Sequence, residues 1–255
     1  MSSTSLKTIA IFGATGGTGL AVLNRSLEAG HTVNVLARTP AKLSVQASKY
    51  PDQLRVIKGD IRDISTIKET LIVNGKVVDI IVSAIGMVFH RKGLSFVAPD
   101  TKVCAEGLSF TLKALGELEQ EAQYGGTDPT FVLLSTTGIS DQGRDIPVAM
   151  IPLYHWALGT AHKDKKLLED TMVKGAGSNR KCVIIRPSLL FDGESKGMQK
   201  IRSSIEIFGA SRKENDKGVA IGYSIHREDV GLWIVESCIN GDASRWTGKM
   251  VTVTY

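Results

Sequence analysis

The sequence has few cysteines and no long apolar run, and both absences narrow the class of protein. Its three cysteines, Cys104, Cys182 and Cys238, are far apart in the chain. They fit neither the spacing of metal ligands nor a disulfide framework, so we expect reduced, mostly buried thiols and no metal site. No segment approaches the ~20 apolar residues of a membrane span, and the first residues lack the apolar stretch of a signal peptide. These absences predict a cytoplasmic protein that does not cross a membrane.

A basic arm is also missing. The net charge is a modest +5, and the lysines and arginines are scattered along the chain, which argues against nucleic-acid binding. The contents of 42% hydrophobic and 22% charged residues are those of an ordinary soluble protein. No repeat, low-complexity stretch or linker divides the chain. We therefore expect one domain over residues 1–255 that takes a small-molecule substrate, as a monomer or a homodimer.

Short apolar runs that predict strands alternate with segments of helical periodicity. The predicted strands are Thr8–Phe12, Thr32–Leu36, Leu54–Lys58, Asp79–Ser83, Thr130–Ser135, Lys181–Arg186 and Lys249–Val253. The predicted helices are Gly17–Ala29, Ile64–Val73, Pro99–Gln123, His162–Lys174 and Arg227–Ile239. This alternation predicts an α/β fold of the Rossmann type, a doubly wound parallel sheet with helices on both faces and a small C-terminal substrate-binding portion.

Two segments interrupt this alternation. Residues 138–160 contain the apolar run I-P-V-A-M-I-P-L-Y-H-W-A-L, and residues 189–223 are rich in glycine, serine and charge. Both follow the carboxyl ends of predicted strands, where ligands of open α/β sheets bind. We therefore predict that they form lids on the substrate side of the site.

The most informative motif is a glycine-rich turn, G-A-T-G-G-T-G, between the first strand and the first helix. Gly13, Gly16 and Gly19 recur every three residues. Glycines at such positions permit a tight turn, the approach of a phosphate to the backbone, and close packing of helix on strand. The free N–H groups and the positive end of the helix dipole then favour a diphosphate. The turn predicts a dinucleotide site with contacts from Gly13, Thr15, Gly16, Gly17, Thr18 and Gly19.

The ends of the next strands predict the rest of the cofactor site. An acidic residue after the second strand would bind the ribose of NAD, but the chain has Arg38 and then Lys42, which suit the 2′-phosphate of NADP. Asp60 and Ile61 follow the third strand, where they would meet the adenine. The fourth strand runs into small residues that would let the cofactor pass close to the backbone. We expect contacts there from Ser83, Ala84, Ile85 and Gly86.

These motifs, with L-S-T-T-G, I-I-R-P-S and H-R-E-D-V-G further along, resemble those of atypical short-chain dehydrogenase/reductases. The likeness is to the NAD(P)H-binding branch that includes biliverdin/flavin reductases and NmrA-like proteins, and it extends over nearly the whole chain. It implies a Rossmann fold, NADP(H), and often the reduction of a small organic substrate. It also implies cofactor contacts near the nicotinamide from Pro187, Ser188 and Leu189.

The catalytic half of the site departs from the superfamily pattern. Its ordinary members use a Tyr-x-x-x-Lys pair, whereas Tyr154 is followed at the fourth position by Leu158. The segment resembles the atypical arrangement, in which a helix-borne lysine remains near the nicotinamide, and we assign this role to Lys165. A solvated helix face is the alternative. The resemblance points to Thr136 as the hydroxyl that faces the nicotinamide, and Tyr154 is a further candidate; a strand-end cap is the alternative for Thr136.

The leading hypothesis is an NADPH-dependent oxidoreductase that reduces a small, largely apolar or aromatic molecule such as an enone, quinone, flavin or imine. Such acceptors take a hydride without a dedicated tyrosine, provided that the nicotinamide and the acceptor carbon are held close in a dry pocket. The missing Tyr-x-x-x-Lys pair keeps two alternatives open. These are an NmrA-like redox sensor that binds NADP without turnover, and a non-redox isomerase or cyclase on the same fold.

Overall fold

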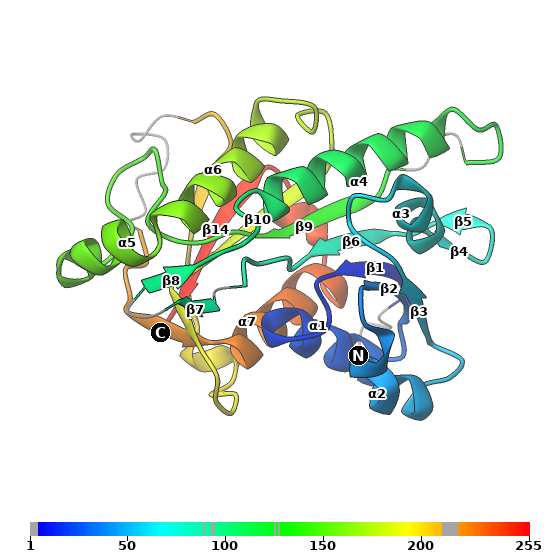
Figure 1. Ribbon diagram of the computed structural model, residues 1–255, viewed down its shortest axis with the longest axis horizontal. Helices are drawn as coiled ribbons and strands as arrows, with labels where there is room; N and C mark the ends of the chain where they lie inside the picture. Colours follow the sequence, from blue (N-terminus) through cyan, green and yellow to red (C-terminus); the bar gives the residue numbers. More distant parts are fainter. Residues whose placement is uncertain (1–4, 89, 93–94, 125, 127, 211–218) are drawn as a thin grey trace.

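A sheet of eight strands runs through the centre of the protein (Figure 1) in the order β12-β14-β10-β9-β6-β1-β2-β3. The structure is a computed structural model that describes residues 5–88, 90–92, 95–124, 126, 128–210 and 219–255. Neighbouring strands pair in parallel except for β12, which is antiparallel to β14. The strands are β1 (Thr8–Phe12), β2 (Thr32–Ala37), β3 (Leu54–Lys58), β6 (Ile80–Ser83), β9 (Thr130–Leu134), β10 (Cys182–Pro187), β12 (Arg202–Ile207) and β14 (Lys249–Thr254).

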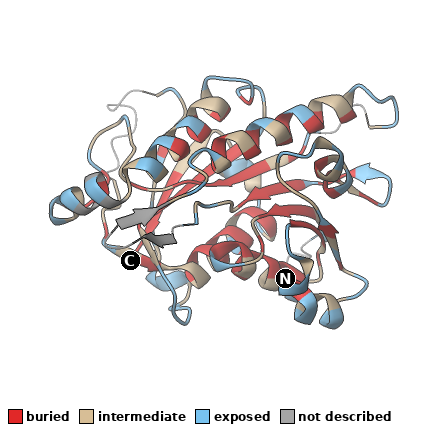
Figure 2. Cartoon of the chain, viewed as in Figure 1, coloured by how far each residue is buried: buried red, intermediate tan, exposed pale blue. Residues whose placement is uncertain are grey.

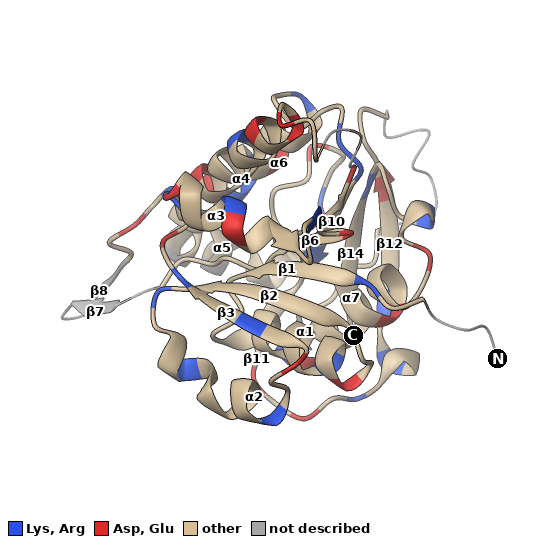
Figure 3. Cartoon of the chain, turned by 90° about the vertical axis from the view of Figure 1, so that its right-hand side faces the viewer, with Lys and Arg blue, Asp and Glu red and all other residues tan. Residues whose placement is uncertain are grey.

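Helices cover both faces of this sheet, as the edge-on view in Figure 3 shows. Helices α3, α4 and α6 lie on one face, and α1, α2 and α7 lie on the other. The main helices are α1 (Gly17–Glu28), α2 (Ser44–Lys49), α3 (Ile64–Leu71), α4 (Val103–Glu119), α5 (Ile151–Ala157), α6 (Gly159–Val173) and α7 (Arg227–Ile234), the last continued by a π-helical turn at Val235–Ile239. The predicted Rossmann-type architecture is therefore confirmed.

Each strand contributes to two cores because its side chains alternate between the two faces. In β1, Ile9 and Ile11 belong to the cluster beneath α1 and α7, whereas Ala10 and Phe12 belong to the cluster beneath α3, α4 and α6. Figure 2 shows the buried sheet between helices whose outer sides are exposed. Burial on both faces explains why the central strands β1, β6 and β9 are nearly continuous apolar runs.

The largest error in a predicted helix start concerns α4, which begins at Val103 and not at Pro99. Its first turn is capped from another helix, because the buried carboxylate of Asp164 on α6 accepts hydrogen bonds from the backbone N–H groups of Cys104 and Ala105, each at 2.9 Å. A capping residue normally precedes its own helix. Local pattern therefore did not indicate this start.

Short elements lie outside the predicted pattern. Ile72 and Val73, predicted as the end of a helix, form a strand of a small hairpin. Within 189–223, Arg202–Ile207 forms the edge strand β12. The remaining short strands are β4 (Ile72–Val73), β5 (Lys76–Val77), β7 (His90–Lys92), β8 (Ser95–Val97), β11 (Leu189–Phe191) and β13 (Ser224–His226).

All three cysteines are free and buried, as the sequence predicts. Burial raises the pKa of the Cys104 thiol to about 11 and that of Cys238 to about 12, so neither is a ready nucleophile. Among the described residues, no helix combines the length and the apolar character that a membrane crossing requires.

Candidate functional site

A cleft of about 670 Å³ lies along the carboxyl ends of β3, β2, β1, β6 and β9. Strand β1 has β2 on one side and β6 on the other, so the chain order reverses there, at the position where open α/β sheets bind ligands. Most of the residues predicted to hold a dinucleotide line this cleft. They are Gly13, Thr15, Gly16, Gly17, Thr18, Arg38, Lys42, Asp60, Ile61, Ala84, Ile85 and Gly86.

The three glycines of the turn have different surroundings, so a side chain at each position would have a different effect. Gly13 has a φ of +88°, and a Cβ there would stand 2.8 Å from the carbonyl carbon of Ala84. Gly19 does not line the cleft; a Cβ on it would stand 2.2 Å from the carbonyl oxygen of Gly13, so it allows α1 to pack on the end of β1. A Cβ on Gly16 would meet no protein atom within 4 Å. Gly16 therefore leaves open space in the cleft, whereas the other two permit the fold.

The start of α1 suits an anion. The cap residue Gly16 offers no side-chain hydrogen bond, and the first turn contains no acidic residue. The Thr18 hydroxyl in this turn lines the cleft and is buried, and within the described part of the chain it has no hydrogen-bond partner. Donors at a helix N-terminus and an unpartnered hydroxyl fit the diphosphate of a dinucleotide.

Charged side chains surround the end of the cleft that the adenosine half of a dinucleotide would occupy. Arg38 follows β2 and is exposed on the rim, with Lys42 one turn further along. The Asp60 carboxylate accepts a hydrogen bond from the backbone N–H of Arg62 at 3.0 Å. The Arg62 guanidinium pairs with Asp100 at 2.8 Å, and this hydrogen-bonded pair lowers the pKa of the Asp100 carboxyl. Positive and negative groups are thus combined on this rim.

The opposite end of the cleft is apolar, with Lys165 beside it. The lining there includes Met87, Val88, Leu134 and Leu190. The Lys165 ammonium on α6 donates to the backbone carbonyls of Leu134 at 2.6 Å and Ile85 at 2.8 Å. It thereby joins the ends of β9 and β6 at the edge of the cleft.

Helix α6 has no tyrosine one turn before Lys165. The fourth position before it is Ala161, which lies on the same helix face. Tyr154 is on α5 instead, where its hydroxyl lies 3.4 Å from the hydroxyl of Thr137. Burial raises the pKa of the Tyr154 phenol, so it stays protonated at neutral pH. The half-buried Thr136 hydroxyl donates to the Thr137 carbonyl at 3.1 Å.

The remaining predicted cofactor residues lie beside the cleft and not among its lining. Ser83 is buried in β6. Pro187 ends β10, and Leu189 begins β11, where the neighbouring Leu190 lines the cleft. The Ser188 hydroxyl is buried and lies 2.7 Å from that of Thr254.

A buried charge network joins β10, α6 and β12. The Arg186 guanidinium on β10 donates two hydrogen bonds to Glu169 on α6, at 2.7 and 2.8 Å, and one to Glu206 on β12 at 2.7 Å. All three side chains are buried. Burial opposes the charge of Arg186, but the two carboxylates outweigh it and raise the pKa of the guanidinium. This network joins an edge strand and a helix to the centre of the sheet.

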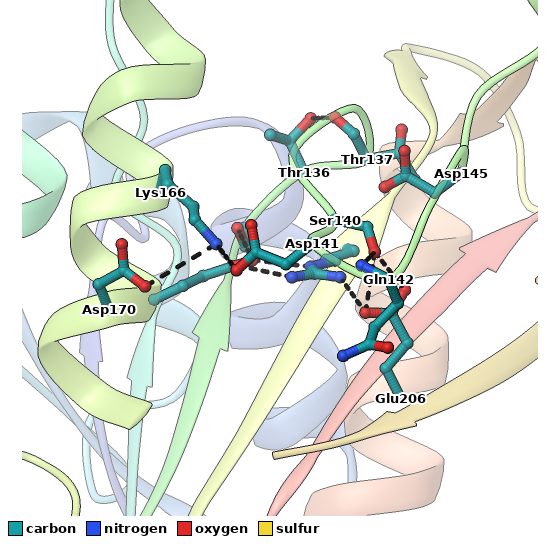
Figure 4. Close-up of polar contacts among 12 residues, drawn as sticks. Thr136, Thr137, Ser140, Asp141, Gln142, Asp145, Lys166, Asp170 and Glu206 are labelled. Carbon is teal, nitrogen blue, oxygen red and sulfur yellow. Dashed lines mark hydrogen bonds and ion pairs between the residues drawn. The ribbon is translucent and has the colours of Figure 1, made fainter. Parts of the chain in front are cut away.

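The same network anchors the start of the predicted lid 138–160 (Figure 4). The Ser140 hydroxyl donates to Glu206 at 2.9 Å, and Asp141 pairs with Lys166 of α6 at 2.5 Å. The buried Asp145 carboxylate accepts from the N–H of Gly138 at 2.9 Å, and burial raises the pKa of this carboxyl. Further along, the Trp156 side chain is 86% exposed.

Several lining residues were not predicted from the sequence. They are Arg62, Met87, Val88, Asp100, Val103, Leu134, Leu190 and Arg227, with Phe12, Leu36, Ala37 and Gly59 at the strand ends. Thr39, which lies between Arg38 and Lys42 in the segment predicted to suit a 2′-phosphate, also lines the cleft. Arg227 is predicted only as the first residue of the helix Arg227–Ile239. The strand that precedes it, β13, was not predicted, so the sequence did not indicate that the start of this helix lies beside the glycine turn.

The chain is similar to known proteins over nearly its full length. A family model described as NAD(P)H-binding matches residues 13–240. Reductase pytE of Aspergillus terreus is 38% identical, with 99% of this chain and 100% of the relative covered. Oxidase pynE of Aspergillus niger is 28% identical, with 98% and 99% covered.

The fold is also that of a solved structure. A short-chain dehydrogenase/reductase from Veillonella parvula, crystallised in complex with NADP, superimposes with a TM-score of 0.67. The match covers 98% of this chain and 95% of that one, at 14% sequence identity. At this identity the likeness shows the fold alone.

Proposed function

The chain belongs to the NAD(P)H-binding family of oxidoreductases, and from this premise we propose that it is an NADPH-dependent reductase of a small, flat, largely apolar molecule. The family match confirms the resemblance to atypical short-chain dehydrogenase/reductases that the motifs indicate. One observation carries the proposal: a single cleft joins the glycine turn and Arg38 to an end lined by Met87, Val88 and Leu190.

The preference for NADPH is supported by the rim at the end of β2. Arg38 and Lys42 stand where an NAD-specific site would place a carboxylate. A guanidinium binds phosphate through paired, charge-assisted hydrogen bonds. We propose that these two residues hold the 2′-phosphate, the α1 N-terminus holds the diphosphate, and Asp60 and Ile61 meet the adenine.

At the apolar end, a bound cofactor supplies the hydride, and the chain supplies position and exclusion of water. Lys165 is fixed by two backbone carbonyls at the strand ends, where we propose that its ammonium orients the nicotinamide ribose. Thr136 is the proposed hydroxyl on the substrate side. Tyr154 stays protonated at neutral pH, and we propose it as an alternative proton donor to the substrate. Its hydroxyl lies against that of Thr137. The apolar lining excludes water from a flat acceptor.

The rival function, an NADP-binding redox sensor, is favoured by Ala161 in the position of the usual tyrosine. Incubation of the pure protein with NADPH and separate flavins, quinones, enones and imines distinguishes the two. We expect loss of the NADPH absorbance only when an acceptor is present. Tight NADPH binding without turnover of any acceptor would instead support the sensor, and product without NADPH consumption would support an isomerase or cyclase.

Replacement of Arg38 by serine tests the cofactor preference. We expect NADPH affinity to fall roughly 10- to 100-fold, because hydrogen bonds to a charged phosphate contribute about 1.5–3 kcal/mol. Binding of NADH should be unchanged, since it lacks the 2′-phosphate. Titration calorimetry with both cofactors measures the ratio. Arg55→Ser is the matched control, because Arg55 on β3 lies outside the cleft and pairs with Glu69 of α3. Equal losses for both cofactors in Arg38→Ser would contradict the assignment.

Lys165→Met tests the catalytic half. We expect kcat to fall on the order of 100-fold, as for loss of a positioned polar catalyst. Stability should also fall by about 1–3 kcal/mol, because the carbonyls of Ile85 and Leu134 lose their donor. The exposed Lys163 on the same helix provides the control variant Lys163→Met. A loss of stability with unchanged kcat would contradict the catalytic assignment and leave Lys165 a purely structural role.

A further inference from the structure

Arg227 stands at the junction of two parallel strands and the cleft. It begins α7 directly after β13, and Asp192 directly follows β11, the strand that pairs with β13. The Arg227 guanidinium donates to the Asp192 carboxylate at 2.8 Å. Arg227 also lines the cleft beside the glycine turn: a Cβ on Gly17 would stand 3.0 Å from its Cδ and 3.3 Å from its Nε.

Two helix N-termini lie beside this arginine. Helices α1 and α7 pack in parallel, because Gly231 lies against Ala21 just as Arg227 lies against Gly17. Both positive helix ends therefore point toward the cleft, and a cation at a helix N-terminus is destabilised. The first turn of α1 has no acidic residue. The first turn of α7 has Glu228 and Asp229, which offset its dipole in part; Glu228 pairs with Arg25, and Asp229 accepts hydrogen bonds from the loop after β11.

The pair with Asp192 compensates only weakly. The Asp192 side chain is 90% exposed and that of Arg227 is 32% exposed, and ion pairs in such surroundings contribute little. Nor is this pair needed to hold the loop after β11. That loop is tied to the buried Asp229 carboxylate by the N–H groups of Lys196 at 2.8 Å and Gly197 at 3.2 Å, and by the Ser195 hydroxyl.

We propose that Arg227 is a diphosphate-binding residue of the cofactor site, and that the diphosphate displaces Asp192 as its partner. The inference rests on dinucleotide binding, but it does not depend on whether NADPH or NADH is the preferred cofactor. A guanidinium next to two helix N-termini and the unpartnered Thr18 hydroxyl completes a site for a dianion. Asp192 then acts as a weak internal competitor that the cofactor replaces.

The test compares three ligands: NADPH, NADH, and adenosine 2′-monophosphate, which lacks the diphosphate. Arg227→Gln should weaken both dinucleotides by the same factor, roughly 10- to 100-fold, and leave the monophosphate within twofold. Arg227→Lys, which keeps the charge but not the planar fork, should lie between. Asp192→Asn should tighten both dinucleotides, by up to about fivefold. Arg25→Gln is the control, because Arg25 pairs with Glu228 on the same two helices outside the cleft.

Thermal unfolding of each variant is measured alongside, and the surface variant Asp192→Asn tests the exchange independently of any folding defect in Arg227→Gln. Wild-type affinity for dinucleotides in Arg227→Gln, or an equal loss for the monophosphate, would overturn the diphosphate assignment. Weaker dinucleotide binding in Asp192→Asn would overturn the proposal that the diphosphate displaces Asp192 from Arg227. A wild-type protein that binds NADH as well as NADPH would refute the NADPH proposal alone, since the effect of Arg227→Gln would still appear with both.

Discussion

Replacement of Arg186 by methionine is expected to destabilise the protein by about 3–5 kcal/mol, the range found when one partner of a buried ion pair is removed. The variant would leave the carboxylates of Glu169 and Glu206 buried without their cation. Domains of this kind are stable by only 5–15 kcal/mol. The midpoint of thermal unfolding should therefore fall by roughly 6–20 °C, as measured by circular dichroism or calorimetry.

The control is Arg55→Met. Arg55 pairs with Glu69 at the surface, so its loss should change stability by about 1 kcal/mol or less. Addition of Glu169→Met to Arg186→Met should recover part of the loss, because one stranded charge is then replaced by an apolar side chain. An unfolding midpoint for Arg186→Met within 2 °C of wild type would contradict this prediction. It would show that water enters, or the structure rearranges, to solvate the two carboxylates.

Two glycines of the same turn are expected to differ when each is replaced by alanine: one variant loses stability, and the other loses dinucleotide affinity. In Gly19→Ala the new Cβ would stand 2.2 Å from the Gly13 carbonyl oxygen, where backbone and not a flexible side chain must move. We expect a loss of about 3 kcal/mol or more, at the upper end of overpacking effects. Cofactor binding should fall with it, because α1 shifts relative to β1.

Gly16→Ala is the matched partner, because its Cβ meets no protein atom and its φ of −174° suits any residue. The fold should keep its unfolding midpoint within about 1 °C, while dinucleotide affinity falls at least tenfold because the methyl group occupies the cleft. Thermal unfolding and titration of the two variants separate these effects. If Gly16→Ala bound NADPH like the wild type, the diphosphate would not pass over this glycine.

Local pattern predicted the parallel strands closely. The bounds of Thr8–Phe12 and Leu54–Lys58 are those expected. For Thr8–Phe12 the reason is that a strand buried on both faces is apolar almost throughout. Strand β12 was not predicted. In it, Glu206 is buried and Ile205 and Ile207 are exposed, the reverse of an ordinary edge strand. Its buried side chain is held by Arg186, a contact that no periodicity reveals.

The amino-acid sequence by itself determined the doubly wound sheet and the glycine turn, and from these came about half of the residues that line the cleft. Such features depend on neighbours a few positions apart, on apolar periodicity and on glycine geometry. Only the tertiary structure decided that Arg227 lies over Gly17, that Asp164 caps α4 and that Arg186 joins Glu169 to Glu206. Each of these depends on where distant segments meet, because a side chain's electrostatic role is set by the groups that burial brings beside it.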